Sequence, residues 1–204
     1  MATVRETVDN AISITGRVEQ RDLAVSELSR VIYEVTSKFD FPQDLKSDYQ
    51  MISQSGELVT GGFEVYVPGD WRKLALVTNG YTGRVLREVT PFTAASHQAQ
   101  CSLQDTFMRY GDSLRGVISE PTEAIVLHGY LSAPRWEPDY QQAVNDNLSH
   151  WLLRGHYQLC LTGLIGKLFR NSGDDESGDR YQGEYLQLRR QLILNAQNMD
   201  GRSL

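Results

Sequence analysis

The Gly166-Lys167 pair is the part of the chain that comes nearest to a phosphate-binding loop. Such a loop needs a second glycine five residues before the pair and a serine or threonine directly after the lysine, because amides and a hydroxyl hold the phosphates and Mg²⁺. The chain has Leu161 and Leu168 at those positions. The pattern therefore excludes a phosphate loop.

Four carboxylates gather in the stretch from Gly173 to Asp179, and carboxylate oxygens are the ligands that calcium prefers. Their spacing departs from the D-x-D-x-D-G pattern, and no glutamate follows where a calcium loop would close. A solvated loop that caps the next helix is the better interpretation, because runs of charge are commonly solvated. The carboxylates are Asp174, Asp175, Glu176 and Asp179.

The histidines, cysteines and serines show no catalytic or metal-binding spacing. No two histidines stand four residues apart, and no H-E-x-x-H frame is present. No serine lies in a G-x-S-x-G elbow. Cys101 and Cys160 lack a C-x-x-C spacing, so we expect two buried thiols. We therefore predict a protein that is not an enzyme and needs no metal or cofactor.

One alternative from another class stays open. A small cytoplasmic enzyme or regulator could assemble its site from scattered polar residues, because a triad needs no local motif. His128, Asp146 and His150 are the residues we would assign to such a site.

The first third of the chain predicts two helices. Thr3 and Glu6 have the spacing of a capping box, and Gly16 is a plausible helix end. A second helix is expected from Arg17 or Asp22 to Lys38, with an apolar stripe facing a core.

The middle of the chain predicts strands. Alternation from Phe63 to Val67 ends at a turn, and Leu74–Thr78 with Val85–Val89 resembles a hairpin. A short helix is expected from Phe92 to Phe107, because its apolar residues recur at helical spacing. Two further strands are expected around residues 117–118 and 124–131.

The last third returns to helix. We expect one helix from Asn147 to Arg170, and its apolar groups occupy more than one face, so other helices or a neighbouring subunit must surround it. A final amphipathic helix is expected from Tyr181 to Ala196. The residues that we assign to subunit contacts are Leu161, Leu164, Ile165 and Leu168.

These elements together predict an α+β chain that is mainly a helical bundle with a small antiparallel β-rich insertion. We expect a single domain over residues 1–204, with a helical part at 1–40 and 138–197. The insertion would span about 47–133, and residues 198–204 would form a flexible C-terminal tail.

Composition restricts the partners. The net charge of −6 argues against a protein that wraps DNA, because such binding depends on lysine and arginine displacing counterions. Most of the 20 basic residues are arginines, which suit protein interfaces. The longest apolar stretch is too short for a membrane span, and the N-terminus does not resemble a secretory signal, so we expect no membrane partner.

Three segments carry a resemblance to a known family: GRVEQRDLAVSELSRVIYEV from Gly16, VYVPGDWR from Val65, and Asn147–Phe169 followed by Tyr181, Tyr185 and Leu188. The order of elements and these segments resemble the adaptor proteins of bacteriophage head-to-tail connectors. The family's members are helical proteins with a β-rich insertion between the second helix and the C-terminal pair.

The resemblance implies a structural virion protein that is made in the host cytoplasm. It implies a homo-oligomeric, commonly dodecameric ring between the portal protein and the tail nozzle, with genomic DNA passing through without sequence-specific binding. A stopper or terminator of the same connector is the alternative. The family's C-terminal segment docks on the portal, which here implies docking by Ile193, Leu194, Asn198, Met199, Arg202 and Leu204.

Overall fold

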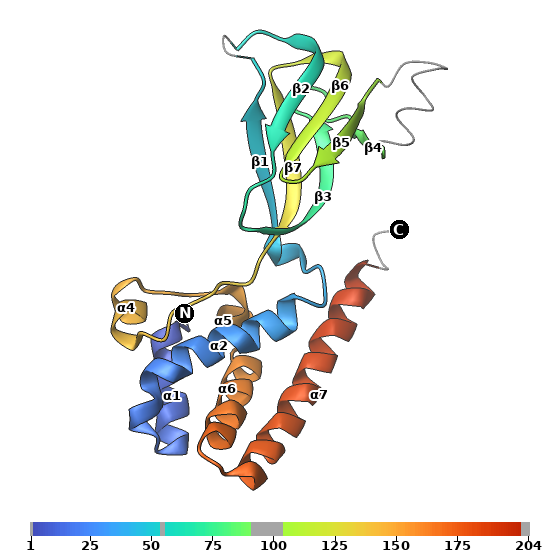
Figure 1. The fold of residues 1–204 in the computed structure, drawn as a ribbon. Coiled ribbons are helices and arrows are strands. Elements are labelled where there is room, and N and C mark those ends of the chain that lie inside the picture. The colour runs from blue at the N-terminus through green and yellow to red at the C-terminus, as the bar shows by residue number, and fades with distance from the viewer. Residues whose placement is uncertain (1, 54–55, 91–103, 201–204) are drawn as a thin grey trace. The chain divides into compact units, whose positions relative to one another are not determined.

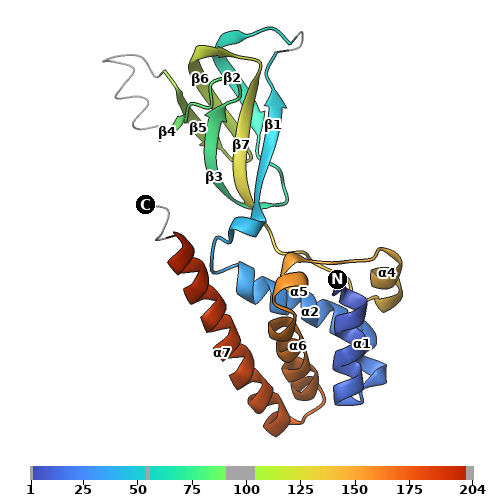
Figure 2. The ribbon, with the colours of Figure 1, turned by 180° about the vertical axis from the view of Figure 1, so that it is seen from behind.

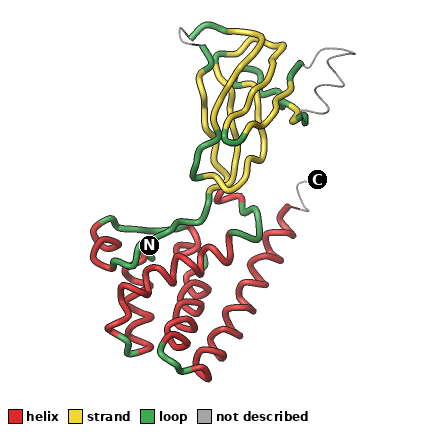
Figure 3. The backbone as a smooth tube through the Cα atoms, viewed as in Figure 1, coloured by secondary structure: helices red, strands yellow, loops and turns green. Residues whose placement is uncertain are grey.

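The structure, a computed structural model, describes residues 2–53, 56–90 and 104–200. Its chain divides into two compact units, one formed by residues 1–43 with 133–204 and the other by residues 44–132. Helices make up the first unit and strands the second (Figures 1 and 3). Each unit has its own buried apolar core.

The expected mainly helical bundle with a small insertion is wrong. The fold is a mixed α+β fold with 46% helix and 27% strand, and the strands form two sheets. The physical reason is that the strands extend well beyond the short alternating runs visible in the sequence. Backbone pairing with a neighbouring strand holds residues extended even where their side chains show no alternation.

The helical unit contains two short 3₁₀ turns and six α-helices among its described residues. In chain order these are α1 (Val4–Thr15), η1 (Val18–Gln20), α2 (Arg21–Thr36), η2 (Pro42–Asp44), which leads into the other unit, α4 (Tyr140–Asn145), α5 (Trp151–Gly155), α6 (Tyr157–Asn171) and α7 (Asp175–Asp200).

The capping box at the start of α1 is confirmed. The Glu6 amide donates to the Thr3 hydroxyl at 3.3 Å, and the Thr3 amide donates to the Glu6 carboxylate at 3.1 Å. Gly16 ends the helix in the left-handed region at φ 70°, where glycine pays no steric cost. Local chemistry alone therefore sets both ends of α1.

The helix expected from Asn147 to Arg170 is interrupted. His156 separates α5 from α6 with φ −135° and ψ 45°, which is not helical backbone. Asn147 has a positive φ of 48° and lies before α5 begins. The apolar spacing runs across this break, so periodicity could not reveal it.

Helix α6 is enclosed by α1, α2 and α7 of the same chain (Figure 2). A Cβ added to Gly163 would lie 2.9 Å from both Tyr185 and Val31, and one added to Gly166 would lie 3.3 Å from the Gln182 amide of α7. The two glycines therefore let neighbouring helices approach closely, which offsets their low helix propensity.

The β unit consists of two sheets that share one core. The first sheet has the order β1-β7-β3 and is antiparallel, and the second has the order β2-β6-β5-β4. The strands are β1 (Leu45–Met51), β2 (Val59–Tyr66), β3 (Trp71–Asn79), β4 (Arg87–Glu88), β5 (Thr106–Tyr110), β6 (Ser113–Thr122) and β7 (Ala124–Leu131).

The expected hairpin of Leu74–Thr78 with Val85–Val89 is only partly present. The chain does turn back after β3, because the Asn79 amide donates to the Arg84 carbonyl and Thr78 pairs with Val85. Strand β4 then leaves β3 and pairs in parallel with β5 of the other sheet. The second arm therefore joins the two sheets along one side instead of completing a two-stranded hairpin.

Two further expectations concern segments that the structure describes only in part, the helix at 92–107 and the tail at 198–204. Most of the helix expected from Phe92 to Phe107 falls on residues 91–103, which lie outside the described residues, and Phe107 itself belongs to β5. The tail expected from residue 198 is wrong at its start, because α7 continues to Asp200. Residues 201–204 lie outside the described part.

Candidate functional site

Helix α7 has one face packed against α6 and another that is exposed. Tyr185 is 1% exposed and Leu192 is 9% exposed on the packed face. Leu186 and Leu194 are each 48% exposed although both are leucines of the same helix. Single exposed leucines are ordinary, but two that line one groove indicate a surface that could bind another protein.

The exposed leucines belong to a shallow groove on α7 with a volume of about 270 Å³, which we call the α7 groove. The Nε atom of Arg189 is buried and has no hydrogen-bond partner within the described part of the chain. An apolar floor with guanidinium groups at its side fits a protein surface that presents apolar and acidic side chains. The groove is lined by Leu186, Arg189, Arg190, Ile193 and Leu194.

The predicted docking residues fall partly in this groove. Ile193 and Leu194 line it, and Asn198 is exposed near the end of the helix. Met199 belongs to α7, but its side chain is not among those that the structure describes. Arg202 and Leu204 lie outside the described residues. The sequence reasoning missed Leu186, Arg189 and Arg190. The sequence did contain a signal for Leu186: it lies eight residues, or about two helical turns, before Leu194, so the two leucines share one face of the helix.

The predicted subunit-contact residues do not lie on the surface. Leu164 and Leu168 are fully buried, Ile165 is 2% exposed and Leu161 is 8% exposed within the chain itself. Their burial within a single chain leaves almost no surface for a neighbouring subunit. The excess of apolar groups on this helix is explained by α1, α2 and α7, which surround it.

A second apolar pocket of about 190 Å³ lies in the helical unit, between η2, α5 and α7, and includes Phe41, Trp151 and Leu192. His156 also lines it, and burial lowers the pKa of this imidazole. The neighbouring His150 accepts a hydrogen bond from the Leu152 amide as the cap of α5, and burial followed by the charge of Arg154 lowers its pKa to about 4. Both imidazoles are therefore neutral near pH 7 and serve packing and capping.

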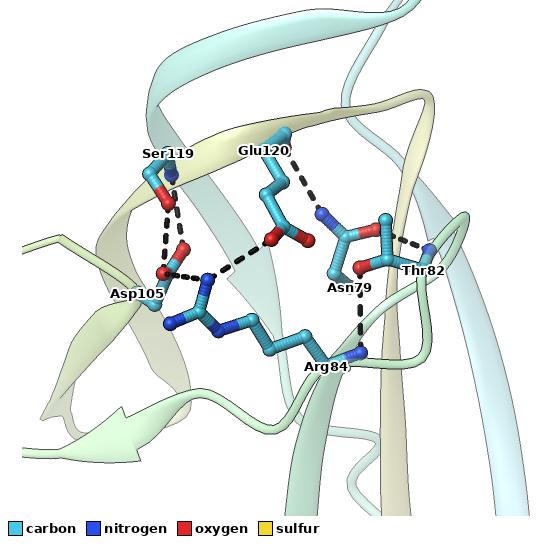
Figure 4. Close-up of polar contacts among 6 residues, drawn as sticks. All are labelled: Asn79, Thr82, Arg84, Asp105, Ser119 and Glu120. Carbon is cyan, nitrogen blue, oxygen red and sulfur yellow. Dashed lines mark hydrogen bonds and ion pairs between the residues drawn. The ribbon is translucent and has the colours of Figure 1, made fainter.

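The β unit contains a polar cluster in which each charged side chain has a partner (Figure 4). The Arg84 guanidinium lies 3.2 Å from Asp105 and 3.0 Å from Glu120. Asp105 also accepts from the amide and hydroxyl of Ser119, and these bonds hold the pKa of its carboxyl below the usual value. The cluster ties β6 to the segments around β4 and β5.

Asn79 completes this cluster from the end of β3. Asn79 is 2% exposed, and its side chain donates to the Glu120 carbonyl and accepts from the Thr82 amide (Figure 4). It also accepts from the Tyr81 amide. Such bonds to the backbone fix the turn that follows β3. The cluster therefore has a structural role, and its polar groups are already engaged with one another.

The three residues of the alternative enzyme site are not gathered in either unit. His128 belongs to the β unit, where its imidazole contacts the hydroxyls of Ser47 and Thr78. Asp146 and His150 belong to the helical unit, where Asp146 is the cap residue at the end of α4 and His150 caps α5.

The described residues offer neither a reactive thiol nor a cluster of metal ligands. Cys160 is buried, as expected, and burial raises the pKa of its thiol to about 12, which makes it a poor nucleophile. Cys101 and His97 lie outside the described residues. Residues 2–53, 56–90 and 104–200 contain no group of three potential metal ligands, and none of their helices is both long and apolar enough to span a bilayer.

No protein-family model matches the chain, and no match to a curated protein was found. The α7 groove combines exposed leucines with arginines, a composition that fits the binding of another protein.

Proposed function

We propose that the chain is a structural protein of a bacteriophage connector, an adaptor that joins the portal ring of the head to the tail. The observation that carries this proposal is the α7 groove, in which two exposed leucines lie with the exposed Arg190 and the half-buried Arg189 on the last helix. The same helix corresponds to the part of the adaptor family that docks on the portal. In this role the protein acts by binding partners and performs no reaction.

The charge distribution supports a contact of this kind. Arg189 and Arg190 supply cationic groups next to Leu186 and Leu194. Guanidinium groups form bidentate bonds with carboxylates and stack on flat surfaces, and leucines contribute apolar area that becomes buried. A portal surface with acidic and apolar residues would satisfy both.

The experiment mixes the purified protein with portal-bearing capsids and measures co-sedimentation, with electron microscopy of the product. Leu186→Ala with Leu194→Ala should weaken binding by about tenfold or more, since burying one leucine contributes roughly 1.5–3 kcal/mol. The matched control is Leu23→Ala on α2, another exposed leucine of the helical unit, which should bind as the wild type does.

Deletion of residues 193–204 should weaken binding further. If the groove variants and the deletion bind as tightly as the wild type, the proposed docking through α7 is overturned. A stopper or terminator role is the second candidate within the same class. It would appear as binding to the tail side of an assembled connector and failure to bind portals that lack an adaptor.

A further inference from the structure

A second groove lies within the helical unit, between α2 and residues 134–136, which follow the β unit in the sequence. It has a volume of about 310 Å³ and we call it the α2 groove. Its aromatic groups are Tyr33, which is 55% exposed, and the half-buried Trp136. Its full lining is Ser26, Ser29, Arg30, Tyr33, Pro134, Arg135 and Trp136.

The α2 groove is rigid because Ser29 joins its two sides. The Ser29 hydroxyl donates to the Pro134 carbonyl at 2.6 Å and accepts from the Trp136 amide at 3.3 Å. The side chain of Ser29 is buried, so these bonds are shielded from water. A groove that is already formed loses little conformational entropy on binding.

The charged groups of the α2 groove are two arginines. Arg30 contacts Glu27 at 2.6 Å, and Arg135 is exposed and has no ion pair with any described residue. A guanidinium has five N–H donors, so Arg30 keeps donors beyond those that Glu27 uses. Together with the two aromatic rings, these groups fit carboxylates carried on a compact turn.

The chain itself carries such carboxylates where α6 connects to α7. They lie in residues 173–179, which comprise the end of the connection and the start of α7 and which we call the acidic turn. Gly173 and Asp174 donate backbone hydrogen bonds to the last residues of α6, and Asp174 caps the amide of Ser177. Asp175 and Glu176 are exposed and form no ion pair within the described part. The acidic turn is therefore preformed, and its two exposed carboxylates have no ion-pair partner among the described residues.

We propose that the α2 groove binds the acidic turn of a second copy of this chain. The two surfaces are complementary in charge, because the exposed guanidinium groups of the α2 groove match the exposed carboxylates of the acidic turn. Copies that each carry a net charge of −6 repel one another unless opposite charges meet at the contact. This inference rests on the proposed function, because it names the contact that builds the connector ring.

The contact is head-to-tail, since the two surfaces are different parts of the chain. Such contacts continue from copy to copy and close into a ring when the rotation between copies allows it. Every copy then uses both its groove and its turn, and only a closed ring leaves neither surface empty. The buried side chains of α6 take no part in this contact.

The test uses two variants of the full-length chain and their mixture. Arg135→Glu disables the groove, and Asp175→Lys with Glu176→Lys disables the turn. Sedimentation velocity at low ionic strength should show self-association of the wild type that weakens with salt. Each variant alone should self-associate about tenfold or more weakly. Arg154→Glu and Glu184→Lys, which reverse exposed charges elsewhere on the helical unit, are the matched controls.

The mixture makes the test specific. The groove variant keeps an intact turn and the turn variant keeps an intact groove, so an equimolar mixture should form heterodimers. These should also associate further, because the charge-reversed groove and the charge-reversed turn attract each other. A chain that combines Arg135→Glu with both lysine substitutions should recover self-association. A wild type that is monomeric at every concentration at low salt, or a mixture of folded variants that forms no heterodimer, would overturn the proposal.

The outcome is separable from that of the proposed function. Portal binding by a chain that never self-associates through these surfaces would reject the inference and keep the adaptor role. Salt-dependent heterodimers from a chain that does not bind portals would do the reverse. If Arg135→Glu weakens binding to an acidic segment of the portal while leaving self-association unchanged, the occupant is the portal and the second-copy proposal fails.

Discussion

Tyr185 of α7 donates a hydrogen bond to the Glu34 carboxylate of α2 across 3.2 Å, and the same carboxylate receives the Lys167 ammonium of α6 at 2.7 Å. One carboxylate of α2 therefore joins that helix to α6 and α7, which lie far from it in the sequence. Burial first, and the charge of Glu34 second, raise the pKa of Tyr185, so the phenol remains a donor over the whole physiological range.

Tyr185→Phe should lower the free energy of unfolding by roughly 0.5–1.5 kcal/mol, because it removes one hydrogen bond and leaves the ring packed. Urea denaturation followed by circular dichroism measures the change. Tyr33→Phe, which alters an exposed tyrosine of the same unit, should leave the unfolding midpoint unchanged. An equal loss in both variants would show that the bond to Glu34 contributes nothing.

Gly163→Ala should destabilise the helical unit by about 1–3 kcal/mol, because the added Cβ would lie 2.9 Å from both Val31 and Tyr185 and force them apart. Gly183→Ala on α7 is the control, since nothing lies within 4 Å of its added Cβ. There the substitution should stabilise by up to about 1 kcal/mol through helix propensity. Thermal unfolding of both variants checks the opposite signs.

The helical unit should lose stability as the pH falls from about 6.5 to about 4. His150 has an ordinary pKa of 6.5 that burial lowers to about 4 in the folded chain, so the unfolded chain takes up a proton first. The contribution of neutral His150 to the free energy of unfolding is fully present above pH 6.5 and decreases by about 3 kcal/mol at most on acidification. His156, whose pKa is also lowered, adds a loss of the same sign.

His150→Asn should make this pH dependence shallower, because asparagine does not titrate and can still accept the Leu152 amide as a helix cap. The measurement is the urea midpoint at a series of pH values. His128→Asn, in the β unit, should leave the pH dependence of the helical unit as it is in the wild type. Equal slopes for the wild type and His150→Asn would contradict the assignment to His150.

Asn79→Ala should destabilise the β unit by roughly 1–3 kcal/mol, because the amides of Tyr81 and Thr82 lose their acceptor and the Glu120 carbonyl loses its donor. Thr82→Ala removes only a 3.4 Å contact with the Arg84 amide in the same turn and should cost less than about 0.5 kcal/mol. Hydrogen exchange of the β3 and β6 amides would show whether the loss is confined to this end of the unit.

The candidate site was predictable only in part. Ile193 and Leu194, which line the α7 groove, were named only because the resemblance implies that the end of the last helix docks on the portal. The arginines of the α7 groove were missed, because sequence spacing gives the face of a helix but not which face another helix covers. Leu164, Ile165 and Leu168 were placed at subunit contacts for the same reason. The sequence shows that an apolar side chain must be buried, but it does not show which helix or subunit buries it.

The sequence by itself determined the features that depend on neighbouring residues: the capping box of Thr3 and Glu6, the glycine end of α1, the apolar stripe of α2 and the strand around Phe63. Only the tertiary structure decided that β4 leaves β3 for β5, that His156 breaks the penultimate helix, and that α6 is enclosed within one chain. These outcomes depend on contacts between residues far apart in the sequence, whose free energies appear only when the chain is folded. Local propensities of a few tenths of a kcal/mol per residue are too weak to oppose them.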